Sequence, residues 1–412
     1  MEQLSGRTET SQLFKDSSER APVRHPLRWS VTVLWLFILA LAAARGQNAA
    51  TTQSTGQNAV AETVVLYDVL HPFWTRSEMD GEPVLFVQKT NSSLATAKLL
   101  FPANKILSMT SGDGRETYEA GRDFVWASGS NTLVLTPTSR IPSKTMAELF
   151  PAKGSPRSFS ETADGKSSIF FAEGGAIFQS LQVNVTYEHQ AHWNGYFPLP
   201  ASRELSRTIS KLQRQQPLKL VVLGDSISHG ANASGTFHSS PYQPPYDGLV
   251  KQAIEVEYGS KIILSNLSVG GTDSKWGVTQ AHAVSDEHPD LVILAFGMND
   301  ASVNKMSPSD YRDHIKAIMD QARASNPEVD FILVATMTGN PDWIKTDQYL
   351  YSEYRSTLIG FAGPGIAVAD MTSIWRDLLK VKKFTDITGN GINHPNDFGH
   401  RVYAQVILSL LK

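Results

Sequence analysis

The sequence predicts a chain of two structural parts, in which an all-β part precedes an α/β part built on a parallel sheet with helices on both faces. From about residue 63 to 200, apolar residues come in short bursts separated by turn-forming residues. After residue 201, unbroken apolar runs alternate with helix-like segments. The length of 412 residues also exceeds that of one ordinary domain, so we expect two domains with additional segments.

The composition excludes several classes of protein. The formal net charge is −3, and no stretch is strongly basic, so we expect no nucleic-acid partner. The chain has no cysteine, which rules out a disulfide framework, a thiolate metal site and a cysteine nucleophile. No group of His, Asp and Glu has the spacing of a metal site, so we expect neither a metal nor another cofactor.

The N-terminal segment has the pattern of an export signal. Arg20, Arg24 and Arg28 precede an uncharged apolar run at 29–44, and small residues end this run. This order is typical of a signal peptide, which we place at residues 1–46. An uncleaved signal anchor is the alternative, because the run is only slightly shorter than the roughly 18–20 residues that span a bilayer. We therefore expect a periplasmic or extracellular protein, with a membrane contact only if the segment is not cleaved.

The next two segments differ sharply in apolar content. Residues 47–62 are small and polar, which predicts a flexible linker. Residues 63–200 contain short β-rich bursts divided by Gly, Pro, Asn and Asp, without a convincing helical pattern. This favours an accessory β-sandwich domain of jelly-roll type. Within it, residues 141–168 are rich in Ser, Pro, Gly and Lys and are expected to form a long surface loop.

Residues 201–412 alternate between strand-like and helix-like segments. The strand-like runs do not alternate between polar and apolar residues, so both faces of each strand should be buried, as in a parallel sheet between two layers of helices. The expected strands are LKLVVLGDS, KIILSNLS, DLVILAFG, DFILVAT and GIAVADM. A connecting helix is expected within 201–214, and further helices around 246–258, 309–325, 346–359, 371–380 and 397–411.

Candidate catalytic residues follow the ends of these strands. Ser226 follows the first strand, Gly271 the second and Asn299 the third, while His394 precedes the last helix. Ligands of an open parallel sheet bind at the carboxyl ends of its strands, so these four residues are expected at one rim. A serine hydroxyl becomes a useful nucleophile when a base removes its proton, and histidine suits that role near neutral pH.

These short segments resemble the sequence blocks of the SGNH (GDSL-type) hydrolases, an esterase superfamily. The resemblance covers about residues 217–411 and implies a flavodoxin-like SGNH hydrolase domain. It also implies that Ser226 is the nucleophile, His394 its base, and that the N–H groups of Ser226 and Gly271 and the amide of Asn299 form the oxyanion hole. The matching residues are Gly224, Asp225 and Ser226; Asn266 and Gly271; Gly297, Asn299 and Asp300; and His394 with Pro395.

One position departs from the family pattern. The family usually carries an aspartate three residues before the histidine, where it orients the imidazole, but this chain has Gly391. Asp386 and Asn390 are nearby substitutes, and a backbone carbonyl would leave a Ser-His dyad. We assign Asp397 to the N-cap of the last helix instead.

The order of the two parts resembles the layout of carbohydrate esterase family 2. Enzymes of that family remove acetyl groups from plant polysaccharides, which implies that the substrate is an acetylated polysaccharide or another small-acyl ester. A short-chain esterase or lipase, and a glycan O-acetyltransferase, would use the same site. A non-catalytic glycan-binding protein is disfavoured by the intact Ser226, Asn299 and His394. The polar loop at 231–248 disfavours a lipase.

Overall fold

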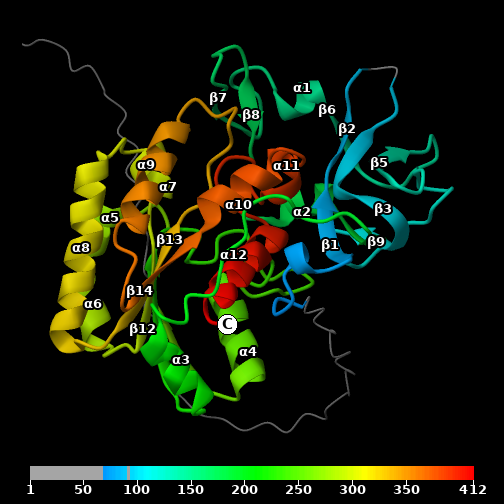
Figure 1. The fold of residues 1–412 in the computed structure, drawn as a ribbon. Helices are drawn as coiled ribbons and strands as arrows, with labels where there is room; N and C mark the ends of the chain where they lie inside the picture. Colours follow the sequence, from blue (N-terminus) through cyan, green and yellow to red (C-terminus); the bar gives the residue numbers. More distant parts are fainter. Residues whose placement is uncertain (1–67, 91–92) are drawn as a thin grey trace, which may run out of the picture. The chain divides into compact units, whose positions relative to one another are not determined.

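The computed structural model describes residues 68–90 and 93–412, all of which belong to one compact unit, Ala61–Lys412 (Figure 1). The predicted signal segment at 1–46 and the linker at 47–62 lie outside the described residues. Among the residues that are described, no helix combines the length and the apolar character needed to cross a membrane.

The α/β part contains the predicted parallel sheet. Its strand order is β11-β10-β12-β13-β14, and all neighbours run parallel. Every residue of β12 and β13 is buried, which explains why their sequences show no polar alternation. Because β10 lies between β11 and β12, its carboxyl end is the point where the chain changes direction across the sheet, and ligands bind at such points. The strands are β10 (Leu218–Gly224), β11 (Ile262–Asn266), β12 (Leu291–Ala295), β13 (Asp330–Ala335) and β14 (Ile366–Asp370).

Helices cover both faces of this sheet, as predicted (Figure 1). In α8, buried residues recur every three or four positions, and Ser307 caps the first turn by accepting a hydrogen bond from the Asp310 N–H. One face carries α3 (Ser206–Gln213), α4 (Tyr246–Tyr258) and α12 (Asp397–Leu410). The other carries α5 (Ser274–Thr279), α6 (Ala281–Asp286), α8 (Pro308–Ser325) and α9 (Gln348–Ile359). Three further helices complete this part: α7 (Met298–Ser302), α10 (Met371–Leu378) and α11 (Phe384–Ile387).

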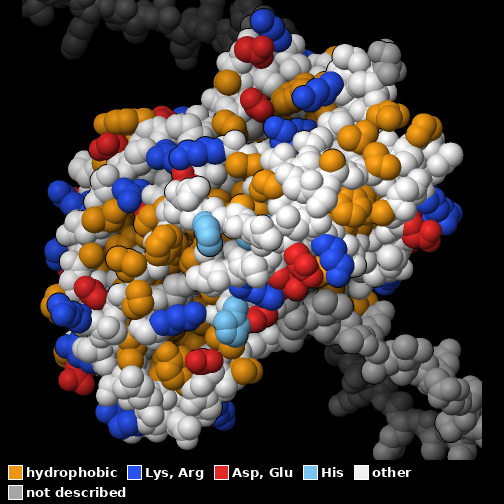
Figure 2. Space-filling model, turned by 45° about the vertical axis from the view of Figure 1, so that its right-hand side comes forward, with side chains coloured by type: hydrophobic (Ala, Val, Ile, Leu, Met, Phe, Trp, Pro, Cys, Tyr) orange, Lys and Arg blue, Asp and Glu red, His pale blue; other side chains and the backbone are white. Residues whose placement is uncertain are grey.

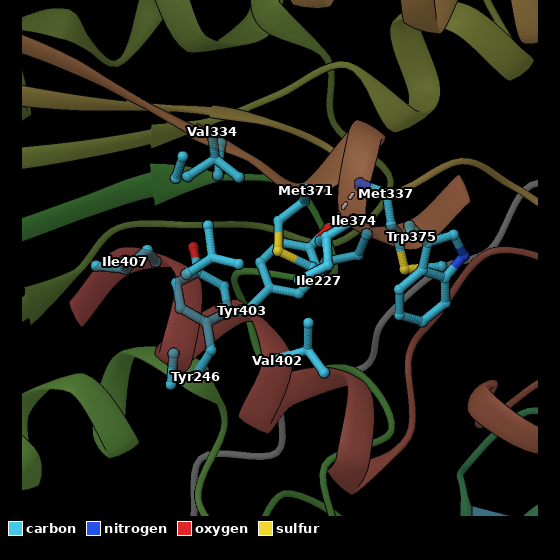
Figure 3. Close-up of a cluster of buried hydrophobic side chains, with 14 of the residues drawn as sticks. Ile227, Tyr246, Val334, Met337, Met371, Ile374, Trp375, Val402, Tyr403 and Ile407 are labelled. Atoms are coloured by element: carbon cyan, nitrogen blue, oxygen red, sulfur yellow. Dashed lines mark hydrogen bonds between the residues drawn. The ribbon is translucent and has the colours of Figure 1, made fainter. Parts of the chain in front are cut away.

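The last helix, α12, anchors the core beneath the rim (Figure 3). Its buried Val402, Tyr403 and Ile407 lie in one cluster with Ile227, the residue after Ser226. The Tyr403 hydroxyl accepts a hydrogen bond from the Met337 N–H at 3.0 Å, just beyond the end of β13. The cluster therefore fixes the loops after β10 and β13 against the same helix.

The N-terminal part is β-rich, as predicted. Its main sheet has seven strands, with the order β1-β9-β3-β2-β6; in addition, β5 pairs with β3 and β4 pairs with β5. In β9, alternate residues are buried, as expected for a strand with one face on the core. The jelly-roll arrangement remains a prediction. The strands are β1 (Glu78–Val84), β2 (Phe86–Gln88), β3 (Thr96–Ser111), β4 (Phe124–Val125), β5 (Ser130–Leu135), β6 (Ser143–Thr145) and β9 (Val183–His189).

Two expectations for this part were wrong. Residues 141–168 are not a plain surface loop, because they contain β6, α1 (Met146–Leu149) and a hairpin of β7 (Ser158–Glu161) with β8 (Ser168–Phe170). The hairpin is stabilised by the α/β part, since the Ala163 N–H donates to the Asp342 carbonyl at 2.8 Å. In addition, η1 (Phe73–Thr75), α1 and α2 (Ala176–Leu181) are helical where no helix was expected.

A buried ionic cluster joins the β-rich and α/β parts. The Lys382 ammonium pairs with the Glu82 carboxylate, and both side chains are at most 1% exposed. The Tyr187 hydroxyl donates to Glu82 at 2.6 Å, and the Leu85 N–H donates to Asp386 at 2.9 Å. Such a cluster tolerates little displacement, because separating its members would leave charges buried without partners.

The outer surface carries mixed charges. Figure 2 shows acidic and basic side chains interspersed over one face of the molecule, in keeping with the formal net charge of −3.

Candidate active site

The candidate nucleophile lies in a tight loop at the carboxyl end of β10. Gly224 ends this strand, and a Cβ atom there would lie only 2.6 Å from the Ala295 carbonyl oxygen of β12. Only glycine permits this approach. The next residue, Asp225, accepts a hydrogen bond from the Ile227 N–H at 3.0 Å and so fixes the turn that presents Ser226.

Ser226 and His394 are in direct contact, although 168 residues separate them. The Ser226 Oγ lies 2.9 Å from the His394 Nε2. The other ring nitrogen, Nδ1, lies 2.8 Å from the Asn232 Oδ1. Since the Asn232 Nδ2 donates to the Gly389 carbonyl at 3.0 Å, the amide oxygen must face the ring and accept the Nδ1 proton. This tautomer leaves the Nε2 lone pair directed at Ser226, as a general base requires.

The orienting residue is therefore Asn232, and the expectation of Asp386 or Asn390 was wrong. Asp386 is occupied by the Leu85 and Lys383 N–H groups, both 2.9 Å away, because it belongs to the junction between the two parts. The Asn390 Oδ1 accepts from main-chain N–H groups, including that of His394 at 3.2 Å. Asn390 thus shapes the loop without touching the imidazole.

Packing explains why glycine replaces the family aspartate at 391. Gly391 has a φ of 90°, and a Cβ atom there would lie 2.3 Å from the Phe170 carbonyl oxygen of β8. A side chain at this position would displace the β-rich part from the loop that carries His394. The orienting function is provided by Asn232 instead.

Burial sets the protonation state of the imidazole. It lowers the pKa of His394 to about 4, and repulsion from the neighbouring His400 acts in the same direction. The ring is therefore neutral near pH 7 and able to accept a proton. The Ser226 and His394 residues remain 9% and 8% exposed, so the pair borders solvent.

The loop that carries Gly271, one of the expected oxyanion donors, lies beside Ser226. A Cβ atom on Gly270 would lie 3.8 Å from the Ser226 Cβ, which places this loop against the nucleophile. Gly271 follows with a φ of 79° and is exposed. The Asn299 side chain donates to the Thr272 carbonyl at 2.7 Å, so this amide is fixed to the same loop and retains a second N–H.

Buried acids stabilise the surrounding loops. Asp300 accepts hydrogen bonds from the N–H groups of Gly297 and Ser274, both at 3.0 Å, and burial raises its pKa. Asp397 is not the N-cap of α12 as expected, because Asn396 fills that position. Asp397 instead accepts from the Ser234 N–H at 2.7 Å, in the loop that carries the orienting amide.

Sequence reasoning missed Asn232 because no motif marks it. It lies six residues after Ser226 in a left-handed conformation with a φ of 64°, which asparagine tolerates better than most residues. Glu173 was also missed; its Oε1 lies 4.0 Å from the His394 Nδ1. Within 68–90 and 93–412, no group of three or more His, Asp and Glu residues is arranged to hold a metal ion.

A serine hydroxyl in contact with a buried, neutral imidazole is the arrangement of a serine hydrolase. Comparison with known proteins gives the class more closely. Residues 222–402 match the model of the GDSL-like Lipase/Acylhydrolase family, so this part of the chain is a GDSL-like acylhydrolase domain. No curated protein matches the chain.

Solved structures with similar folds include esterases. A two-domain esterase (CEX) active on acetylated mannans is 21% identical, with a TM-score of 0.41 over 53% of this chain and 53% of that protein. The chain therefore spans about half of that relative's length. A carbohydrate esterase family 3 protein from Talaromyces cellulolyticus is 16% identical, with a TM-score of 0.37 over 46% of this chain and 94% of that protein.

Proposed function

We propose that this protein is a serine esterase that hydrolyses small acyl esters, in the first place acetyl esters, on carbohydrate. One observation carries the catalytic part of the proposal. The Ser226 Oγ lies 2.9 Å from the His394 Nε2, while the Asn232 amide holds the opposite nitrogen of the ring at 2.8 Å. This is the geometry of a serine activated by an oriented base.

The reaction follows in two balanced halves. The Ser226 Oγ attacks the ester carbonyl carbon as its proton passes to the His394 Nε2. The N–H groups of Ser226 and Gly271 and the amide of Asn299 stabilise the oxyanion. The intermediate then expels the sugar alcohol, which receives the proton from Nε2. Water attacks the acyl-enzyme in the same way, releasing the carboxylic acid and restoring the serine.

The openness of the rim supports a polymeric substrate. Val269 is 46% exposed, and Gly270 and Gly271 beside it are also exposed. An acyl group carried on a bulky chain can reach such a surface without the carrier having to enter a deep cavity. The polar loop at 231–248 favours a sugar over a long acyl chain. The β-rich part ahead of the hydrolase domain agrees with the resemblance to carbohydrate esterase family 2.

Acetate release by the full chain tests this proposal. We expect release from acetylated mannan, acetylated xylan and p-nitrophenyl acetate, and loss of at least about 10³-fold in kcat for Ser226→Ala. Ser239→Ala, a nearby serine whose hydroxyl bonds Gln179, is the matched control and should keep its activity. Full activity of Ser226→Ala would overturn the mechanism.

Three other results would replace the proposed substrate class. Faster turnover of p-nitrophenyl decanoate than of the acetate would indicate a lipase. Transfer of acetyl to an added glycan, with no free acetate, would indicate an acyltransferase. Glycan binding without hydrolysis of any ester would indicate a binding protein.

We also infer export from the cell, on the evidence of the arginine-flanked apolar run at 29–44. N-terminal sequencing of the protein recovered from the periplasm or medium should begin near residue 47. Recovery only from detergent-extracted membranes, with an intact N-terminus, would indicate the signal anchor instead.

A further inference from the structure

The imidazole of His394 has a neutral orienting partner. Asn232 fixes the tautomer, but an amide carries no charge to stabilise the imidazolium that forms when Ser226 gives up its proton. The family aspartate would supply that charge, yet Gly391 stands in its place. Of the two acids near the loop in sequence, Asp386 accepts from Leu85 and Asp397 from Ser234.

A carboxylate from the β-rich part faces the same ring nitrogen. The Glu173 Oε1 lies 4.0 Å from the His394 Nδ1. The backbone before Glu173 is bonded to the loop that carries His394, since the Ala172 N–H donates to the Asn390 carbonyl at 3.3 Å. After it, Gly175 has a φ of 79° and lies so close to Phe237 that a Cβ atom would be 2.3 Å from the ring. Both flanks therefore hold Glu173 at the rim.

We propose that Glu173 is a positioning residue that stabilises the imidazolium of His394 through space. This inference rests on the proposed function of the Ser226–His394 pair. The β-rich part would then supply the negative charge that the family takes from the hydrolase domain itself. At 4.0 Å from Nδ1, the Glu173 carboxylate does not replace the hydrogen bond between Asn232 and this nitrogen. Asn232 therefore orients the ring, and Glu173 supplies the negative charge.

Two titratable side chains near the ring have opposite effects on its protonation. His400, on α12, is fully buried and opposes protonation of His394. Glu173 has a side chain that is 64% exposed and favours protonation. Because water screens an exposed charge, its influence must be moderate and must weaken as salt is added.

Glu173→Gln in the full chain tests the proposal, with p-nitrophenyl acetate as substrate. We expect kcat/KM at pH 7 and low ionic strength to fall about fivefold, the effect of a unit charge 4.0 Å away that is largely screened by water. The acid midpoint of the kcat/KM profile lies near the His394 pKa of about 4, and at that pH Glu173 is itself mostly protonated because burial raises its pKa. The difference in kcat/KM between parent and variant should therefore be small near pH 4 and grow as the pH rises to 7 and Glu173 ionises. Added NaCl at about 0.5 M should remove most of the difference between parent and variant.

Two further variants make the test specific. Glu257→Gln removes the same charge from an exposed position on α4 and should match the parent in rate and pH profile. Glu173→Asp keeps a carboxylate and should recover part of the lost rate. If Glu173→Gln and Glu257→Gln have the same pH profile and salt dependence, the role of Glu173 is refuted. Activity that survives Ser226→Ala would instead refute the underlying function.

Discussion

Replacing Asn232 by leucine removes the orienting hydrogen bond while keeping a side chain of similar shape. The change deletes the 2.8 Å contact with the His394 Nδ1 and the 3.0 Å bond to the Gly389 carbonyl. Loss of a charged orienting residue in a serine hydrolase lowers kcat about 10⁴-fold. Because Asn232 is neutral, we expect a smaller decrease, about 10²- to 10³-fold. The carbonyl left without its donor should also lower the free energy of unfolding by about 1–3 kcal/mol, and leucine at a φ of 64° should add about 1 kcal/mol to this loss.

Asn232→Asp tests the same contact in the opposite direction. It places a buried carboxylate 2.8 Å from Nδ1, where a negative charge favours the protonated ring. The pKa of His394, which burial lowers to about 4, should rise, and the base is active only above this pKa. The acid midpoint of the kcat/KM profile should therefore move up by about 1–3 pH units.

The assay is hydrolysis of p-nitrophenyl acetate between about pH 3.5 and 9, with unfolding in urea measured on the same samples. Asn326→Leu is the matched control, because it also removes a hydrogen bond from a side-chain amide to a main-chain carbonyl, that of Pro289 at 2.8 Å. It should lower stability without changing kcat. A leucine variant at 232 with parental kcat, together with an unmoved acid midpoint in the aspartate variant, would refute the assignment of Asn232.

Three further predictions concern the buried polar groups. Lys382→Met should lower the free energy of unfolding by about 3–5 kcal/mol, because it leaves the Glu82 carboxylate buried without its partner; a loss below about 1 kcal/mol in urea would contradict this. His400 stays neutral in the fold because burial lowers its pKa to about 4, whereas the unfolded chain takes up a proton below about pH 6.5. The free energy of unfolding should therefore decrease as the pH is lowered from about 6.5 to about 4. His400→Gln should reduce that slope by up to about 1.4 kcal/mol per pH unit, as measured by urea unfolding at several pH values, and an unchanged slope would contradict it. Gln182→Leu should lower kcat about 10- to 100-fold, because its amide donates to carbonyls of the segment leading to His394; parental kcat in a folded variant would contradict this.

The sequence was sufficient for the features that depend on local pattern. Strands β12 and β13 were predictable because both of their faces are buried, which requires unbroken apolar runs. The closeness of Ser226 and His394 followed from the same logic. Once the strands are parallel, residues at their carboxyl ends share a rim, even at a separation of 168 residues.

Features that depend on contacts between distant segments were not predictable. Asp386 lies eight residues before His394, but nothing in the local sequence shows that Leu85 and Lys382 occupy its carboxylate. The sequence of the β7–β8 hairpin has the composition of a polar loop. Part of its pairing is with the α/β part, through the bridge between Thr162 and Trp343, and the local sequence does not indicate this contact. The contact between Asn232 and His394 likewise depends on how the loops that carry these two residues pack together.

The contacts of the loop that carries His394 indicate that the β-rich part helps to form the site. Gln182 donates to the Thr388 carbonyl at 2.9 Å and accepts from the Asn396 side chain at 3.0 Å, so it bridges both ends of the loop that carries His394. At the middle of the loop, Gly391 packs against the Phe170 carbonyl. A loop with this many external contacts takes its shape from its surroundings. The distance between Ser226 and His394 is therefore a property of both parts together, and substitutions in the β-rich part should change kcat even where they lie far from bound substrate.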